Sequence, residues 1–244
     1  MAGVHLYDDI FARNRLLWGE DAQKSLRQSW VALAGLGGVG SYVAEALARA
    51  GIGGLTLIDH DRVELSNINR QLPALLPFLG QPKVEVVGER VAAINPDCGL
   101  QLLKEFIDPD NVEILGEADY YIDAIDHLPG KAAIISYAFS LGKPVASAMG
   151  AGLRMAPECL RLADISQSRG CPLARELRKR LRALGIERGV TVVYSEEQPV
   201  KGGLPKEAPA QGQKRPIGSS PFVPGAAGLL LASAVIRDLA GIER

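Results

Sequence analysis

The sequence has few cysteines and almost no net charge. Three of its 244 residues are cysteines, and their spacing is unpaired, which argues against a disulfide framework. The formal net charge is −1, so any contact with nucleic acid must come from a local basic patch rather than from overall charge. These scarcities exclude a disulfide-rich secreted domain and a uniformly basic nucleic-acid binder.

The sequence also lacks a long hydrophobic run and a signal-peptide core. The apolar stretch near its end, Gly225 to Ile236, is shorter than the roughly 20 residues of a membrane span. Residues 1–15 mix charged and apolar side chains. Hydrophobic residues make up 47% and charged residues 23%, which is ordinary for a globular protein. We expect a soluble, cytoplasmic protein without a membrane span.

Strand and helix patterns alternate along most of the chain. Short apolar runs at residues 29–34, 55–58, 100–103, 120–124 and 144–147 predict strands, and helical periodicity predicts helices over 39–50, 83–94 and 131–140. This alternation predicts an α/β fold: a Rossmann-like, mostly parallel sheet with helices on both faces.

The chain divides into three predicted parts. Residues 1–28 read as a helical arm, with Ile10, Leu16, Leu17 and Trp18 as candidate anchors, and residues 29–150 as the core. Residues 151–244 predict a smaller α+β extension: strands at 160–163 and 191–194, a basic helix at 172–184 and a closing helix at 225–239. Between these elements, residues 195–220 carry four prolines and four glycines, which predicts a long flexible loop. Loops of that length are usually functional or disordered, and this one is a candidate to close over a substrate.

A glycine-rich turn between the first strand and helix predicts a nucleotide site. In Gly35-Leu36-Gly37-Gly38-Val39-Gly40, the glycines permit a tight turn, close approach of phosphate and helix–strand packing. The helix N-terminus adds amides and a favourable dipole. Asp59 follows Gly40 by about 20 residues, the spacing of a ribose-binding carboxylate.

The residues after Asp59 favour ATP over a nicotinamide dinucleotide. Cleavage between the α and β phosphates needs cations, which Arg70 and Lys83 supply. Asp126 follows a strand, where a carboxylate can hold Mg²⁺. The predicted ligands also include three residues of the intervening segment, Asp61, Asn67 and Gln71.

The run from Gly35 to Gln71, with Lys83 and Asp126, resembles the ubiquitin-activating-enzyme superfamily, whose bacterial members include MoeB, ThiF and HesA. The resemblance implies that the glycine turn binds phosphate, Asp59 the ribose and Asp126 the metal. It assigns the phosphates to Asn67, Arg70, Gln71 and Lys83. It also implies a homodimer in which Arg13, or alternatively Arg15, reaches the partner's active site.

Two further features narrow the resemblance. The sulfur-carrier activators of this superfamily usually carry two Cys-x-x-Cys pairs for zinc, and this sequence has none. Residues 172–182 instead resemble the tRNA threonylcarbamoyladenosine dehydratases. That resemblance implies ATP-dependent adenylation of the threonyl carboxylate on a tRNA adenosine, followed by cyclisation with release of AMP and diphosphate. A cysteine desulfurase or sulfur acceptor is a candidate partner.

Residues 169–188 contain seven basic and two acidic side chains. This bias favours contact with RNA phosphates, and the alternative is a solvated face opposite inward-facing leucines, Leu173 to Leu184. Both readings are compatible on one helix. The predicted RNA contacts are Arg175, Arg178, Lys179 and Arg182.

The sequence alone leaves two other functions open. The carboxylate to be activated is alternatively the C-terminal glycine of a ubiquitin-like sulfur carrier, with Cys171 as a candidate nucleophile. A non-catalytic NAD-binding adaptor is a third reading, against which Arg70, Lys83 and Asp126 count.

Overall fold

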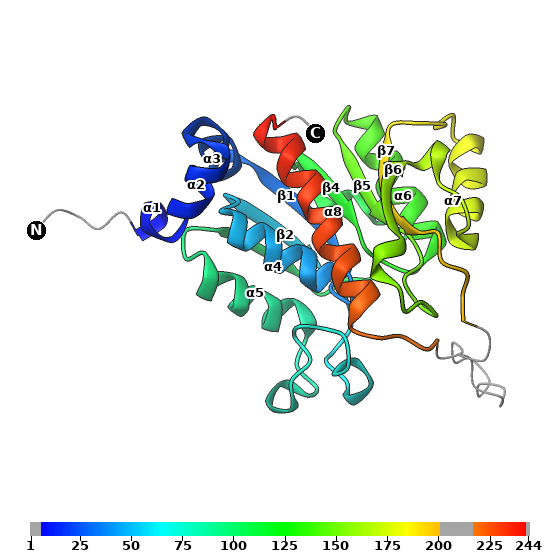
Figure 1. The fold of residues 1–244 in the computed structure, drawn as a ribbon, viewed down its shortest axis with the longest axis horizontal. Helices are drawn as coiled ribbons and strands as arrows, with labels where there is room; N and C mark the ends of the chain where they lie inside the picture. The colour runs from blue at the N-terminus through cyan, green and yellow to red at the C-terminus, as the bar shows by residue number, and fades with distance from the viewer. Residues whose placement is uncertain (1–5, 201–216, 243–244) are drawn as a thin grey trace, which may run out of the picture.

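A single seven-stranded sheet organises the protein. The computed structural model describes residues 6–200 and 217–242, and Figure 1 shows its fold. The strand order is β3-β2-β1-β4-β5-β7-β6, and only β6 runs antiparallel to its neighbour, β7. The strands are β1 (Trp30–Ala34), β2 (Gly54–Ile58), β3 (Gly99–Leu103), β4 (Tyr120–Asp123), β5 (Val145–Ala148), β6 (Leu160–Asp164) and β7 (Val190–Ser195).

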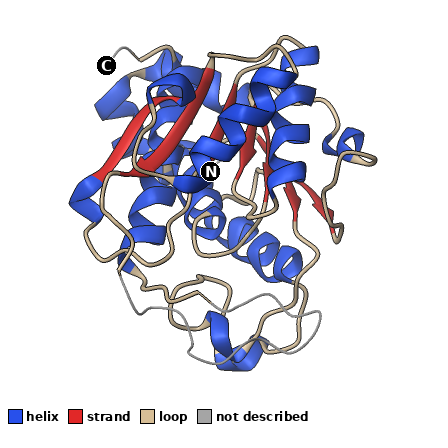
Figure 2. Cartoon of the chain, turned by 90° about the vertical axis from the view of Figure 1, so that its right-hand side faces the viewer, coloured by secondary structure: helices blue, strands red, loops and turns tan. Residues whose placement is uncertain are grey.

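Helices cover both faces of the sheet, and the alternation of side chains along each strand feeds two hydrophobic cores. In β1, Val31 and Leu33 join the core under α4 (Gly40–Ala50), α5 (Lys83–Ile94) and α8 (Phe222–Ala240). Ala32 and Ala34 face the opposite core, with α6 (Leu128–Ser140) and α7 (Pro172–Ala183). Figures 1 and 2 show this layered arrangement. The predicted Rossmann-like fold is confirmed.

Most predicted elements match the structure to within a residue or two. The predicted helix 83–94 coincides with α5. Two helices begin earlier than predicted, α6 at Leu128 and α8 at Phe222. In α6 the imidazole Nδ1 of His127 accepts a hydrogen bond from the Gly130 amide, and Pro129 sits in the first turn, where its missing N–H costs nothing.

The predicted C-terminal extension shares its sheet with the predicted core. Its strand β7 pairs in parallel with β5, and β6 pairs with β7, so both complete the sheet that the core begins. Its last helix, α8, packs against α4 and α3 (Glu20–Gln28), next to α4 in Figure 1, and it also contacts β5, β6 and β7. The predicted division at residue 150 therefore falls within one continuous sheet. Residues 201–216 of the predicted loop lie outside the described residues.

Helix α8 is the one described helix that is long and apolar enough to cross a membrane, by length and composition alone. Half of that apolar window is buried inside the protein, and Val223, Leu231 and Val235 belong to the hydrophobic core. Its apolar character therefore has an explanation in packing. One such helix is weak support for a membrane span.

The N-terminal arm consists of α1 (Leu6–Ile10), α2 (Ala12–Trp18) and α3. Most of its predicted anchors are wrong, because Ile10, Leu16 and Leu17 are 41%, 88% and 80% exposed, while Trp18 is partly buried. Tyr7, Phe11 and Leu26 hold the arm instead, and the Tyr7 hydroxyl donates a hydrogen bond to the carbonyl oxygen of Gly51.

Candidate functional site

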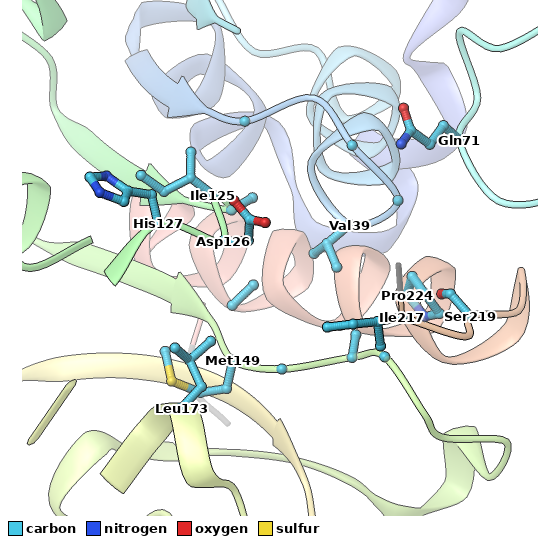
Figure 3. A pocket seen from close by; sticks show the side chains of 18 of the residues that line it. Val39, Gln71, Ile125, Asp126, His127, Met149, Leu173, Ile217, Ser219 and Pro224 are labelled. Carbon is cyan, nitrogen blue, oxygen red and sulfur yellow. The ribbon is translucent and has the colours of Figure 1, made fainter. Parts of the chain in front are cut away.

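A cavity of about 690 Å³ opens at the carboxyl ends of the central strands. Its lining comes from the loops after β1, β2, β4 and β5, together with the N-terminal ends of α5, α7 and α8. The strand order reverses between β1 and β4, and open α/β sheets bind ligands at such a switch point. Figure 3 shows Val39 and Gln71 on one side of this cavity and Met149 and Leu173 on the other.

The glycine turn forms one wall of the cavity. Gly35 has φ +90°, and a Cβ there would lie 2.8 Å from the backbone of Ala124. Gly35, Gly37 and Gly38 line the cavity, as a phosphate-binding turn requires. Gly40 has a different role: it lies outside the cavity lining, and a Cβ there would overlap the carbonyl oxygen of Gly35. Of the four predicted glycines, three therefore face the ligand space, and Gly40 closes the turn.

Asp59, at the end of β2, ties the turn to the next loop. Its Oδ2 accepts a hydrogen bond from the Leu36 amide at 2.6 Å, and its Oδ1 accepts one from the Asp61 amide at 2.8 Å. The residue is 9% exposed and lines the cavity. Each carboxylate oxygen has a second lone pair available, so the contacts leave the predicted ribose role open.

Lys83 and Asp61 form an ion pair at the cavity wall. The Lys83 side chain is 4% exposed, and its Nζ lies 2.7 Å from Oδ2 of Asp61, which is half exposed. The Lys83 amide also donates to the carbonyl oxygen of Asp61, so both residues are fixed where α5 begins. The buried ammonium therefore lies at the cavity wall with its counter-charge beside it.

The segment after Asp61 brings three more predicted residues to the cavity. Asn67 ends the short 3₁₀ helix Leu65–Asn67, and its Oδ1 accepts a hydrogen bond from the Glu64 amide. Arg70 Nη1 donates to the carbonyl oxygen of Ser66. Gln71 is 8% exposed, and its Oε1 has no hydrogen-bond partner within the described part of the chain. An unpaired buried amide facing a cavity is consistent with a ligand contact.

Asp126 lies between β4 and α6, and its exposed carboxylate lines the cavity (Figure 3). Mg²⁺ in nucleotide sites is usually held by one or two carboxylates plus phosphate oxygens, so Asp126 fits that donor set. Asp59, His60 and Asp61 also have ligand atoms within 4.8 Å of one another. That cluster suits Mg²⁺ less well, because Asp59 accepts two amides and Asp61 pairs with Lys83.

A buried ion pair that the sequence analysis missed supports the Asp126 loop. Lys131 and Asp123 are both fully buried, with Nζ 2.8 Å from Oδ2. Lys131 Nζ also donates to the carbonyl oxygens of Ile125, at 3.0 Å, and Ala148, at 2.7 Å. It thereby joins the ends of β4 and β5 below the cavity. A lysine within the apolar run of α6 was the available signal.

Arg154 is a further residue that the sequence did not reveal. It follows Leu153, whose φ of 59° is the one positive value among described non-glycine residues. Such backbone strain costs about 1–3 kcal/mol and clusters at functional sites. Arg154 is 4% exposed and lines the cavity. No local sequence pattern distinguishes it from a surface arginine.

The cysteines have different surroundings. Cys171 is buried, precedes α7 and lines the cavity. Cys98 is buried outside the cavity lining, and burial raises the pKa of its thiol to about 12. A thiol with so high a pKa is a poor nucleophile at neutral pH, which agrees with an ordinary core residue.

The remaining predicted residues lie away from the cavity. Arg13 is exposed on α2, outside the cavity lining, whereas Arg15 lies 2.6 Å from Asp8 of its own chain. On α7, Arg175, Lys179 and Arg182 are exposed, but the Arg178 guanidinium donates to the carbonyl oxygen of Ser168 at 2.7 Å. The leucine face of α7 is shorter than predicted, because Leu184 is 55% exposed.

Comparisons with known proteins agree with this architecture. The ThiF family model matches residues 11–244. A tRNA threonylcarbamoyladenosine dehydratase of Bacillus subtilis is 40% identical over 238 residues, covering 94% of each chain. One from Escherichia coli is 38% identical, over 91% of this chain and 88% of that protein.

A solved structure extends the likeness to the whole fold. The crystal structure of Escherichia coli tRNA N6-threonylcarbamoyladenosine dehydratase, TcdA, in complex with ATP superposes with a TM-score of 0.87 at 33% identity. The match covers 99% of this chain and 98% of that one. The superfamily resemblance of the sequence is confirmed, and the chain belongs to the ThiF family.

Proposed function

We propose that this protein is an ATP-dependent tRNA threonylcarbamoyladenosine dehydratase. The observation that carries the proposal is the cavity, which combines a phosphate-binding turn with Lys83, Arg70 and an exposed carboxylate, Asp126. Dehydratases of this name match nearly the full chain, and one of them is known in complex with ATP.

The reaction has two steps. A carboxylate oxygen of the threonylcarbamoyl group attacks the α-phosphorus of ATP, and diphosphate leaves. A nucleophile of the same side chain, its carbamoyl group, then attacks the acyl carbon and loses a proton, and AMP leaves with the former carboxylate oxygen. The second step is intramolecular, so correct positioning supplies much of its rate.

The cavity residues have separate roles in this proposal. The amides of the glycine turn bind phosphate oxygens, and Asp59 binds the ribose. Lys83 and Arg70 stabilise the negative charge that develops on the diphosphate, and Asn67 and Gln71 complete its binding. Arg70 is less buried than Lys83, so it is better placed for the part of the triphosphate nearer solvent.

Mg²⁺ fits the same site through Asp126. When bound, the ion neutralises phosphate charge and orients the triphosphate. The Lys131–Asp123 pair holds the ends of β4 and β5 in place, and the Asp126 loop follows β4 directly.

The exposed basic face of α7 is the proposed tRNA contact. Arg175, Lys179 and Arg182 are spaced by four and three residues, so they lie on one face of the helix, while Leu177 and Leu181 are buried. Arg178 contributes less, because it supports the loop before α7. Because its proposed substrate is tRNA, we place the protein in the cytoplasm.

A homodimer completes the proposal. The exposed apolar side chains of α2, Leu16 and Leu17, form a surface next to Arg13 that a second copy can cover. Within the described part of the chain, the side chain of Arg13 has no hydrogen bond or ion pair, whereas that of Arg15 is held by Asp8. This contrast favours Arg13 as the residue that reaches the partner's cavity.

Mixing Arg13→Ala and Lys83→Ala proteins restores partial activity if the site is shared, and none if it is not.

One assay tests the function. The protein is incubated with ATP, Mg²⁺ and either threonylcarbamoyl-modified tRNA, unmodified tRNA or a ubiquitin-like carrier protein, and AMP is measured. AMP formation that requires the modified tRNA, with Cys171→Ala still active, supports the dehydratase. Carrier-dependent AMP formation that Cys171→Ala abolishes supports the second function, activation of a sulfur carrier. Binding of NAD without any AMP formation supports the adaptor.

A further inference from the structure

Arg154 is a buried cation with an unused binding edge. The residue is 4% exposed, yet its Nε and Nη2 atoms have no hydrogen-bond partner in the described part of the chain. These two atoms lie on one edge of the guanidinium plane. That edge presents two parallel N–H groups, the geometry that binds a carboxylate or phosphate through both of its oxygens.

The opposite side of the guanidinium is anchored. Nη1 donates to the carbonyl oxygens of Gly150, at 2.8 Å, and Gly152, at 3.2 Å. The segment around Arg154 is fixed as well: the carboxylate of Glu197 accepts hydrogen bonds from the Met155 and Ala156 amides. The free edge is therefore held in place before any ligand arrives, which lowers the entropic cost of binding.

A buried guanidinium with two unpaired donors is costly unless an anion completes it. Nε and Nη2 are themselves closed to solvent in this conformation, so an anion can reach them only from the cavity that Arg154 lines, once neighbouring side chains move aside. We propose that Arg154 forms an oxyanion subsite that binds the free carboxylate of the substrate through Nε and Nη2. This proposal rests on the proposed dehydratase function and adds the residue that recognises the group to be activated.

The position of Arg154 favours the substrate over the nucleotide. The phosphate-binding turn follows β1, whereas Arg154 follows β5, and β4 lies between them. Neighbouring strands are about 4.8 Å apart, so the two segments leave the sheet roughly 10 Å from each other. The nucleotide's phosphates already have the glycine turn and Lys83. A second anion-binding group across the cavity suits the second reactant.

The burial of Arg154 favours a side chain over an RNA backbone phosphate. A guanidinium that is 4% exposed is out of reach of a phosphate on the surface of a folded tRNA, but a group that projects from one base can enter the cavity. Apolar residues also line the cavity, including Met149 and Leu173 (Figure 3). A low local dielectric strengthens a charge-assisted hydrogen bond to a carboxylate.

The test measures binding without ATP. The probes are an anticodon stem-loop with threonylcarbamoyladenosine, the same stem-loop with unmodified adenosine, and one whose threonyl carboxylate is a methyl ester. We expect the wild-type protein to bind the free carboxylate roughly tenfold to hundredfold more tightly than the other two. Arg154→Met should abolish this preference while leaving the Kd for unmodified RNA and for ATP unchanged.

Two controls separate the outcomes. Arg154→Lys keeps the positive charge and can still donate hydrogen bonds to the two carbonyl oxygens, but it lacks the pair of parallel N–H groups. An ATP-induced rise in Tm confirms that this variant is folded. We expect it to lose most of the preference. A preference that survives in both variants overturns the inference, as does a loss confined to ATP binding. If the wild-type protein forms no AMP with modified tRNA, the proposed function itself fails; if it does form AMP, only the subsite is in question.

Discussion

The buried pair of Lys131 and Asp123 makes a quantitative prediction about stability. Lys131→Met keeps the aliphatic stem but removes the ammonium, which leaves the fully buried Asp123 carboxylate without its counter-charge. The carbonyl oxygens of Ile125 and Ala148 also lose a donor. Breaking a buried pair by removing one partner costs about 3–5 kcal/mol of unfolding free energy. For a chain of this size, that cost lowers Tm by roughly 6–20 °C.

A second lysine provides a matched control. Lys143 lies 3.5 Å from Asp119, but both side chains are exposed, at 41% and 48%. Lys143→Met should therefore change the free energy of unfolding by less than about 1 kcal/mol. Urea denaturation monitored by circular dichroism measures both variants under the same conditions.

The pair also predicts a partial rescue. Adding Asp123→Asn to Lys131→Met removes the uncompensated charge, so the double variant should be more stable than Lys131→Met alone. Equal destabilisation by Lys131→Met and Lys143→Met would refute the reasoning, because burial would then not decide the cost. The absence of any rescue would show that the lost carbonyl contacts, rather than the charge, dominate.

Three further predictions concern the turn, a surface ion pair and α7. Gly40→Ala should abolish ATP binding measured by calorimetry, because the added Cβ would overlap the carbonyl oxygen of Gly35 and distort the turn. An unchanged Kd for ATP would contradict this packing argument. Burial raises the pKa of Glu45, but hydrogen bonds from Arg90 and Arg49 outweigh this effect, so the pKa is lowered overall. Glu45→Gln should therefore reduce the free energy of unfolding by up to about 1 kcal/mol at pH 7. This difference should disappear as the pH falls from 4.5 through the lowered pKa, because Glu45 is then protonated in the folded protein as well. A constant cost across that pH range would exclude the ion pair as its cause. Replacing Arg175, Lys179 and Arg182, three of the exposed basic residues of α7, by alanine should weaken the salt dependence of tRNA binding. The slope of log K against log salt concentration should fall in magnitude by about 2–3, and an unchanged slope would place the RNA elsewhere.

Local patterns in the sequence were enough to predict the fold and the cavity wall formed by the glycine turn and Asp59. The spacing of glycines, the strand before them and Asp59 after them all act within one βα unit, so short-range sequence carries the information. Short apolar runs that suit buried strands predicted the sheet for the same reason. The predicted anchors of the N-terminal arm failed because helical periodicity does not say which face meets the core, and Leu16 and Leu17 lie on the other one.

The sequence by itself determined that the chain folds as an α/β protein of the ubiquitin-activating superfamily with a glycine-rich turn after its first strand, because those features depend on neighbouring residues. Only the tertiary structure decided what faces that turn across the cavity. The order of the strands brings the end of β5 beside β4, and with it Arg154 and the carbonyl that Lys131 binds. Whether a given arginine is a solvated surface charge or a buried cation with a free edge depends on contacts between distant segments, and no local pattern encodes them.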